Sequence, residues 1–354
     1  MQSLYVSTPR RRVIFLRSHA SILGLCFAAL AAGSALPARA EDPISIKIAT
    51  LAPEGTTYIK LVRGSTKEIE NRLNGRVKFT IYCGGCQGGE KVTVQKMKTG
   101  QLQGTALSVV GLSTIAPDIA TLNLPMVFSN KEELVATREA MADRFANELW
   151  DNGYKLVGWG DAGFFYLFSA HPIRNPDDLT KGRVWVWNAD PVFNEMTLEI
   201  GVSPIPLGVA DVLSALNTGQ VDTVLMNPFA LVSLQWYTKM KYRMSEPILF
   251  AIGALLIDRS VWEKLTPEEQ KIFISVNEKW SRVAREKLDR DNRRAIEFLR
   301  DQGVETVIPS EADMAAWENV SRATWTRLVG HIYSEEVLAE MLQHRDTFRS
   351  RLTR

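Results

Sequence analysis

A single helical pattern limits most strongly what this chain can fold into. It runs from Pro267 to Gln302, with Thr266 placed to cap its first turn and Gly303 placed to stop it. At about 1.5 Å per residue such a helix is roughly 54 Å long, which exceeds the width of an ordinary domain. A coiled-coil dimer arm is the alternative, but the apolar positions do not keep a strict heptad. We therefore expect one long helix that contacts two lobes.

Strand-like and helix-like segments alternate along much of the remaining chain. Such alternation is typical of parallel sheets covered by helices, so the sequence predicts an α/β protein. Strands are expected at residues 44–51, 77–81, 103–110, 154–159, 163–169, 183–187 and 221–225, and helices at 56–74, 132–150, 192–200 and 210–217.

The first 40 residues have the pattern of a cleaved export signal. Arginines precede an uncharged apolar stretch over residues 20–36, and the small-residue site Ala38-Arg39-Ala40 follows it. A retained membrane anchor is the alternative, but the apolar stretch is short for one. The pair Arg11-Arg12 leaves both general secretion and twin-arginine export open. The chain is therefore predicted to act outside the cytoplasm.

Length and charge narrow the class of partner. Removal of 40 residues from 354 leaves 314, enough for two domains with cores of their own. Five of the 42 Lys and Arg residues precede residue 41, which leaves 37 against 40 Asp and Glu. This slightly acidic balance gives no electrostatic reason to expect nucleic acid or an anionic membrane as a partner.

Two cysteines remain after the signal, Cys83 and Cys86, in a glycine-rich stretch. A small-loop disulfide suits an oxidising compartment, and we predict one here. A thioredoxin-like redox pair is the alternative, but it needs the attacking thiolate at a helix start. A metal site would need two further ligands, and the neighbouring sequence offers none. No metal is therefore expected.

The signatures of common enzymes are missing from the sequence. The histidines beyond the signal, His171, His331 and His344, have no metal-ligand pair spacing, and neither G-x-S-x-G nor H-E-x-x-H occurs. The glycine-rich stretch 83–89 lacks the Lys-Ser/Thr of a phosphate-binding loop. We therefore expect a protein that is not an enzyme and uses no cofactor. A structural scaffold is the third class, and a co-purifying ligand would argue against it.

Five short motifs occur in a specific order along the chain. They are Lys47-Ile48-Ala49-Thr50, Tyr82-x-Gly84-Gly85-x-x-Gly88, Leu124-Pro125-Met126-Val127-Phe128, the segment Pro172 to Leu179, and Ala215-Leu216-x-Thr218-Gly219-x-Val221-Asp222. In this order the chain resembles periplasmic solute-binding proteins of the tripartite ATP-independent (TRAP) transporter family, dicarboxylate-binding type. The resemblance implies a periplasmic receptor that takes a small-molecule ligand, works with TRAP-type permease subunits, and is a monomer or a homodimer.

The resemblance also implies a clamshell of two α/β lobes with mixed sheets, a ligand cleft between the lobes, and the long helix spanning both. On this basis lobe I is expected at residues 41–162 plus 254–290, and lobe II at 163–253 plus 291–354. The pivot is expected near residues 162–164 and 252–255, where the chain passes between the lobes.

The chain departs from the family at the positions that grip a carboxylate. Family members that bind carboxylates place an arginine six residues beyond the Asp-Leu pair, where its guanidinium makes two parallel hydrogen bonds. Counted from Leu179, that position is Trp185, and a second basic position corresponds to Phe165. The asparagine usual near the end of the next strand corresponds to Asn227 with a one-residue insertion, and to Met226 without it.

These replacements predict a different ligand. An indole has one N–H donor and an apolar face, and a buried carboxylate without a cation would lose several kcal/mol. We therefore expect a ligand with apolar or planar surface. Its binding residues are predicted to be Trp185, Trp187, Phe165, Asn188, Asn227, Gln235, Trp236, Tyr58 and Glu90. Two alternatives stay open: the tryptophans fill a core, or another cation binds an ordinary organic acid.

Overall fold

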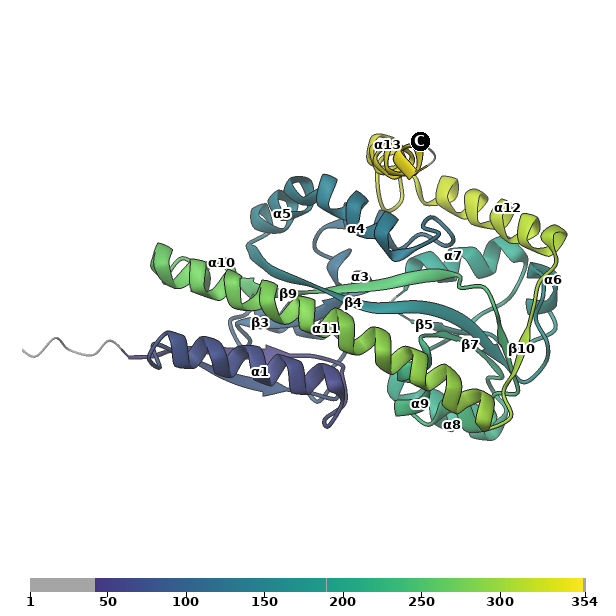
Figure 1. Ribbon diagram of the computed structural model, residues 1–354, viewed down its shortest axis with the longest axis horizontal. Helices are drawn as coiled ribbons and strands as arrows, with labels where there is room; N and C mark the ends of the chain where they lie inside the picture. The colour runs from purple at the N-terminus through teal and green to yellow at the C-terminus, as the bar shows by residue number, and fades with distance from the viewer. Residues whose placement is uncertain (1–41, 189, 353–354) are drawn as a thin grey trace, which may run out of the picture. The chain divides into compact units, whose positions relative to one another are not determined.

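Two long antiparallel strands, β4 (Tyr154–Ser169) and β9 (Leu249–Asp258), run through the centre of the computed structural model (Figure 1). The structure describes residues 42–188 and 190–352. The predicted export signal, residues 1–40, lies outside the described residues. The sequence predicted β4 as two strands, but the chain continues across residues 160–163 through an irregularity in the pairing. Gly163 (φ +96°) adopts there a conformation that favours glycine.

One mixed sheet extends from this central pair in both directions. Beyond β9 follow β3 (Gly104–Ser108), β1 (Ile44–Ala49) and β2 (Val77–Tyr82). The other end of β4 pairs with β7 (Thr223–Met226) and β8 (Tyr242–Met244), and β10 (Glu305–Val307) pairs with β8. A separate two-stranded parallel sheet joins β5 (Trp185–Trp187) to β6 (Ile205–Leu207). The predicted α/β architecture with mixed sheets is confirmed.

Helices cover these sheets. Their bounds are α1 (Thr57–Arg72), α2 (Glu90–Lys98), α3 (Val109–Leu112), α4 (Lys131–Ala140), α5 (Ala142–Asp151), α6 (Pro176–Leu179), α7 (Pro191–Ile200), α8 (Val212–Thr218), α9 (Pro228–Ser233), α10 (Arg259–Trp262), α11 (Pro267–Asp301), α12 (Glu311–Leu328) and α13 (Glu335–Leu352), with 3-10 turns η1 (Pro117–Asn123), η2 (Val209–Asp211) and η3 (Trp236–Lys239). The helix predicted over 132–150 is broken at Met141 into α4 and α5. Within the described residues, no helix is long and apolar enough to span a bilayer.

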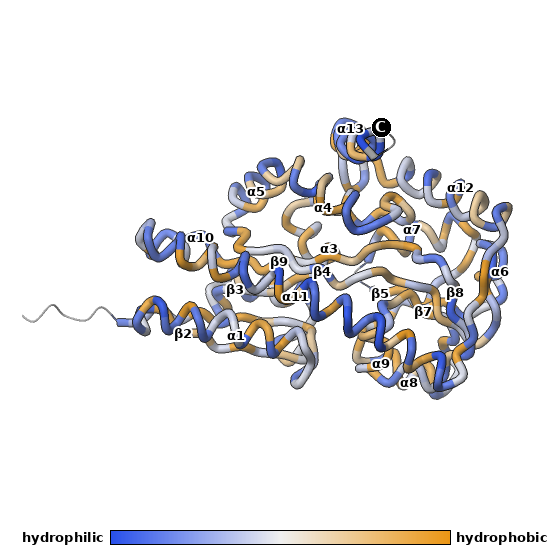
Figure 2. Tube along the Cα trace, viewed as in Figure 1, coloured by the Kyte–Doolittle hydropathy of each residue, from blue (hydrophilic) through white to orange (hydrophobic). Residues whose placement is uncertain are grey.

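The long helix α11 is present as predicted and ends at Asp301. The Thr266 side chain and Glu269 form a capping box at its start, which satisfies backbone N–H groups that would otherwise lack partners. It packs against α1, β4 and α9 in turn, so it contacts elements at both ends of the sheet (Figure 1). Figure 2 shows a largely hydrophilic α11, whose few buried residues, among them Phe273 and Leu299, face the sheets.

The C-terminal helices connect the two ends of the sheet. Helix α12 packs against α7 and α6, whereas α13 packs against α4 and η1. The sequence prediction assigned both helices to the second lobe. The exact lobe boundaries stay a prediction.

Candidate functional site

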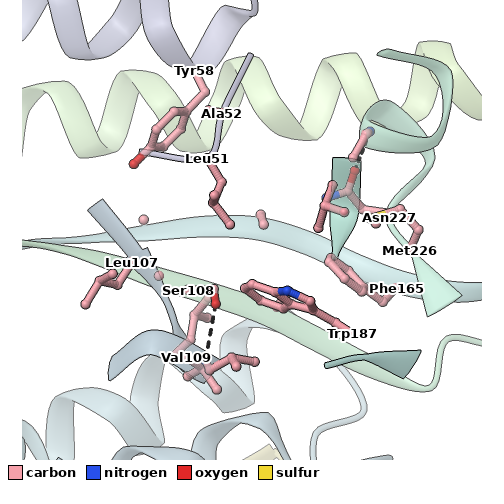
Figure 3. Close-up of a pocket in the computed structure, with 18 of the residues that line it drawn as sticks. Leu51, Ala52, Tyr58, Leu107, Ser108, Val109, Phe165, Trp187, Met226 and Asn227 are labelled. Carbon is pink, nitrogen blue, oxygen red and sulfur yellow. Dashed lines mark hydrogen bonds between the residues drawn. The ribbon is translucent and has the colours of Figure 1, made fainter. Parts of the chain in front are cut away.

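A cavity of about 330 Å³ lies beside the central strands β4 and β9 and takes its lining residues from both ends of the sheet (Figure 3). Residues that directly follow β1, β3 and β7 line it, together with Trp187 at the end of β5. Ligand crevices of open α/β sheets lie outside the carboxyl ends of strands. The β4 irregularity (Gly160 to Ala162), residues 251–253 of β9 and Leu288 of α11 also line it. The cavity is therefore built from elements far apart in sequence.

Aromatic side chains form much of the cavity wall. Trp187 and Phe165 are both half-buried and line it, and Tyr58 lies on the opposite side in Figure 3. Half-buried aromatic rings on a cavity wall leave apolar faces available for stacking. These three predicted residues do come together.

Trp185 belongs to the core and to the cavity wall at once. It is 4% exposed, and its indole Nε1–H donates a hydrogen bond to the Leu207 carbonyl at 3.1 Å. Its ring packs edge-on against Trp236, with centroids 5.1 Å apart and an interplanar angle of 82°. Because its only donor is already used, Trp185 offers a ligand apolar surface and no hydrogen bond.

Asn227 is a buried residue of the cavity lining whose side-chain Nδ2 group is a hydrogen-bond donor that the described residues leave unused. Its Oδ1 accepts a hydrogen bond from the Ala230 backbone N–H at 2.6 Å and so caps α9. Among residues 42–188 and 190–352, no protein acceptor is paired with its Nδ2 group. Met226, the alternative equivalent residue, lines the same cavity. An amide held in this way can donate to a ligand.

Three predicted binding residues do not line the cavity. Asn188 is exposed, and Gln235 directly precedes the turn η3 as its N-cap residue. Trp236 is 1% exposed and packs behind Trp185. Asn188 and Gln235 were predicted for their hydrogen-bonding amides and Trp236 for its ring, but which side chains reach the cavity depends on tertiary packing, which here places Trp236 against Trp185.

Glu90 and Asp190 are two acids in this apolar wall. Glu90 is buried, and its two oxygens accept hydrogen bonds from the Ser108 backbone N–H and hydroxyl, each at 2.8 Å. Burial raises the pKa of Glu90 to about 7. Asp190 caps α7 through Oδ1, which accepts from Val192 and Phe193 N–H groups, and burial raises its pKa to about 6. Burial therefore disfavours the charged form of both acids relative to an exposed carboxyl group.

The third lining acid, Asp161, already has cationic partners. Its Oδ1 lies 2.7 Å from Arg138 Nη1, with both side chains 6% exposed, and Arg285 Nε lies 3.8 Å from its Oδ2. The Arg138 guanidinium also stacks over Trp159 at 5.2 Å. Within the described part of the chain, no Lys, Arg or His side chain lines the cavity.

The predicted disulfide is absent from the structure, which has Cys83 and Cys86 as free thiols. The Cys83 thiol donates to Glu54 Oε2 at 2.9 Å, whereas Cys86 is exposed. Gly84 (φ +63°) lets the loop turn back and donate its N–H to the Ala52 carbonyl at 2.8 Å. This arrangement gives Cys83 a partner other than Cys86. The described residues hold no cluster of three or more His, Cys, Asp or Glu side chains fit for a metal.

Sequence reasoning missed some lining residues. Ser108 and Asp161 carried no motif, and their importance arises from contacts with Glu90 and Arg138 across the fold. Asp190 did carry a signal, because an Asp-Pro pair shortly after a strand is typical of a helix N-cap followed by proline at the first helical position.

Comparison with known proteins identifies the family. Residues 48–331 match the family described as "Bacterial extracellular solute-binding protein, family 7". The chain belongs to this family. A solute-binding protein of Verminephrobacter eiseniae is 24% identical over 245 residues, which cover 68% of this chain and 72% of the relative. Solute-binding proteins are receptors, so the prediction that this family 7 protein is not an enzyme is confirmed.

Solved structures of TRAP periplasmic solute-binding proteins share the fold. One from Desulfovibrio desulfuricans, with bound sn-glycerol-3-phosphate, has a TM-score of 0.79 at 21% identity and covers 86% of this chain and 97% of its own. Another from Desulfovibrio salexigens, with bound orotic acid, has a TM-score of 0.78 at 19% identity and covers 86% and 99%. The two-lobed TRAP receptor fold predicted for this family 7 protein is confirmed.

Proposed function

We propose that this protein is a periplasmic receptor that captures a small solute in the cavity and delivers it to a TRAP-type membrane permease. Family membership and the shared fold support the receptor role and the permease partner. The export pattern of residues 1–40 supports the compartment. A cavity of about 330 Å³ suits a small molecule rather than a polymer segment.

We further propose that the solute is largely apolar or planar and is not a simple carboxylate. This proposal rests on the residues that line the cavity. Among the described residues, the charged side chains in the lining are all acids. A carboxylate placed among Glu90, Asp161 and Asp190 would meet like charges and find no guanidinium. The two solved structures hold orotic acid and sn-glycerol-3-phosphate, so the ligand proposed for this receptor differs in charge from theirs.

Trp187 and Phe165 are the proposed stacking residues, with Asn227 as a hydrogen-bond donor. Both rings are half-buried and line the cavity, whereas the Trp185 ring is almost fully buried and packs edge-on against Trp236. Aromatic anchors in desolvated pockets commonly supply most of the binding energy.

An ordinary organic acid is the competing ligand class, and it would have to recruit Arg138. That arginine is paired with Asp161 at 2.7 Å and is buried with it. Removing one partner of a buried ion pair costs about 3–5 kcal/mol, because the other charge stays uncompensated. The existing pair therefore opposes this route.

Calorimetric titration of the purified protein tests the ligand class. Indole serves as a neutral planar probe, with succinate and D-glucuronate as acids of the competing class. We expect saturable binding of indole and none of either acid at millimolar concentration. Trp187→Ala should abolish indole binding. Trp150→Ala is the matched control, since Trp150 is also half-buried but stacks under Arg259 away from the cavity. Micromolar binding of either acid would contradict the proposed ligand class while the receptor assignment stands.

A further inference from the structure

The three acids that line the cavity differ in the cationic and hydrogen-bond partners that the protein gives them. Asp161 has two guanidinium partners, so its charge is compensated. Glu90 accepts only neutral donors, the Ser108 N–H and hydroxyl. Asp190 uses Oδ1 to cap α7, and its Oδ2 has no hydrogen-bond partner among residues 42–188 and 190–352. Two carboxyl groups therefore face the cavity without a cation.

A carboxylate without a cationic partner in an apolar wall destabilises the protein unless another group compensates its charge. Desolvation of a charge is offset only by an opposite charge and by hydrogen bonds with good geometry. At Asp190, the Val192 and Phe193 N–H groups and the positive end of the ten-residue helix α7 offset part of the cost of desolvating the carboxylate. They hold one oxygen in place and leave the other open to a ligand.

A second observation also points to a ligand at this place. Asn227 is 7% exposed and lines the same cavity, and its Nδ2 group has no acceptor within the described residues. Buried amide groups normally find a partner in the folded protein. The cavity therefore offers a donor, two acids and an aromatic face together.

We propose that the solute carries a protonated amine or a comparable cationic nitrogen on its apolar body, with Asp190 as the principal counter-ion and Glu90 as the second acid. This inference rests on the proposed receptor function and names the head group of its ligand. The Trp187 ring adds a favourable surface, because a cation is attracted to the face of an indole. The apolar body then occupies the space beside Phe165.

Three probes that share a phenyl ring and differ in head group test this inference. They are 2-phenylethylamine (cationic), 2-phenylethanol (neutral) and 3-phenylpropionate (anionic), each titrated calorimetrically into the intact mature protein at pH 8. We expect the amine to bind at least tenfold more tightly than the alcohol, and the alcohol more tightly than the acid.

The variant Asp190→Asn isolates the proposed counter-ion. Asparagine keeps the oxygen that caps α7, so the fold should be retained. We expect at least a tenfold loss of amine affinity and less than a twofold change for the alcohol. Asp258→Asn is the matched control, because Asp258 caps α10 through a side-chain oxygen and does not line the cavity. It should leave all three affinities unchanged. Glu90→Gln should give a smaller loss, confined to the amine.

Each other outcome overturns the inference in a distinguishable way. Equal affinities of amine and alcohol, unchanged in Asp190→Asn, would overturn the cationic head group and leave the apolar ligand class standing. Tightest binding of 3-phenylpropionate would overturn both. No binding of the amine at millimolar concentration would overturn the inference, while the receptor role is tested separately by solute recovered from the purified protein.

Discussion

Replacing each of the two cavity tryptophans by alanine should separate core from binding surface. Trp185 is 4% exposed, donates to the Leu207 carbonyl and packs edge-on against Trp236. Truncation of a buried Trp costs about 3–5 kcal/mol, and the carbonyl left without its donor adds about 1 kcal/mol. Trp185→Ala should therefore lower the free energy of unfolding by about 5 kcal/mol.

Trp187 should contribute much less to stability. It is half-buried, and its indole N–H has no hydrogen bond within the described residues. At about 25 cal/mol per Å² and on the order of 100 Å² of buried ring surface, Trp187→Ala should cost about 2.5 kcal/mol. The sequence prediction gave Trp185 the anchoring role with an intact fold. From the structure we instead expect Trp185→Ala to lose more stability, and Trp187→Ala to lose ligand affinity with a smaller loss of stability.

Urea unfolding of the ligand-free variants, followed by circular dichroism, measures this difference. Equal slopes of the transitions would license the comparison of free energies. A loss in Trp187→Ala equal to or larger than that in Trp185→Ala would refute the assignment of Trp185 to the core.

Three further predictions concern ionisable groups. The pKa of Glu90 is raised to about 7 in the folded protein against an ordinary value of 4.5, so the folded state retains its proton longer than the unfolded state. The contribution of Glu90 to the free energy of unfolding is then full below pH 4.5 and falls by on the order of 3 kcal/mol as the pH rises to 7. Unfolding of Glu90→Gln, measured over the same pH range, should lack this fall. A pH dependence of stability in Glu90→Gln equal to that of the parent would contradict the burial argument. Arg138→Met should destabilise the protein by about 3 kcal/mol, because Asp161 then keeps, within the described residues, only the more distant Arg285, at 3.8 Å, as a cationic partner, yet it should leave indole affinity unchanged; a loss of ligand affinity without destabilisation would make Arg138 a binding residue. Alkylation without reductant should modify both Cys83 and Cys86, as read by intact mass, whereas two protected thiols would restore the disulfide prediction.

The architecture was predictable where local pattern and tertiary packing agree. The capping residues of α11, Thr266 and Glu269, are local in sequence, so the helix could be placed within a residue or two of its ends. The prediction divided β4 where the chain was expected to pass from one lobe to the other, yet pairing with β9 continues through this point. Long-range pairing of this kind leaves no local signal.

The site was predictable only in part, for a similar reason. The aromatic replacements at Phe165 and Trp185 could be found by alignment to the family pattern, but alignment cannot tell which ring faces the cavity. That depends on the Leu207 carbonyl, contributed by the neighbouring strand. The role of Asp161, on strand β4, likewise depends on Arg138, which approaches from helix α4.

Mass spectrometry of small molecules extracted from the purified protein tests the central claim most directly. The protein is isolated from its own compartment without added solutes, denatured in organic solvent, and the released molecules are quantified against protein. We expect one solute in near-equimolar amount, with an apolar or planar body, a basic nitrogen and no free carboxylate. A uronate, a dicarboxylate or a phosphate ester recovered in that amount would contradict it.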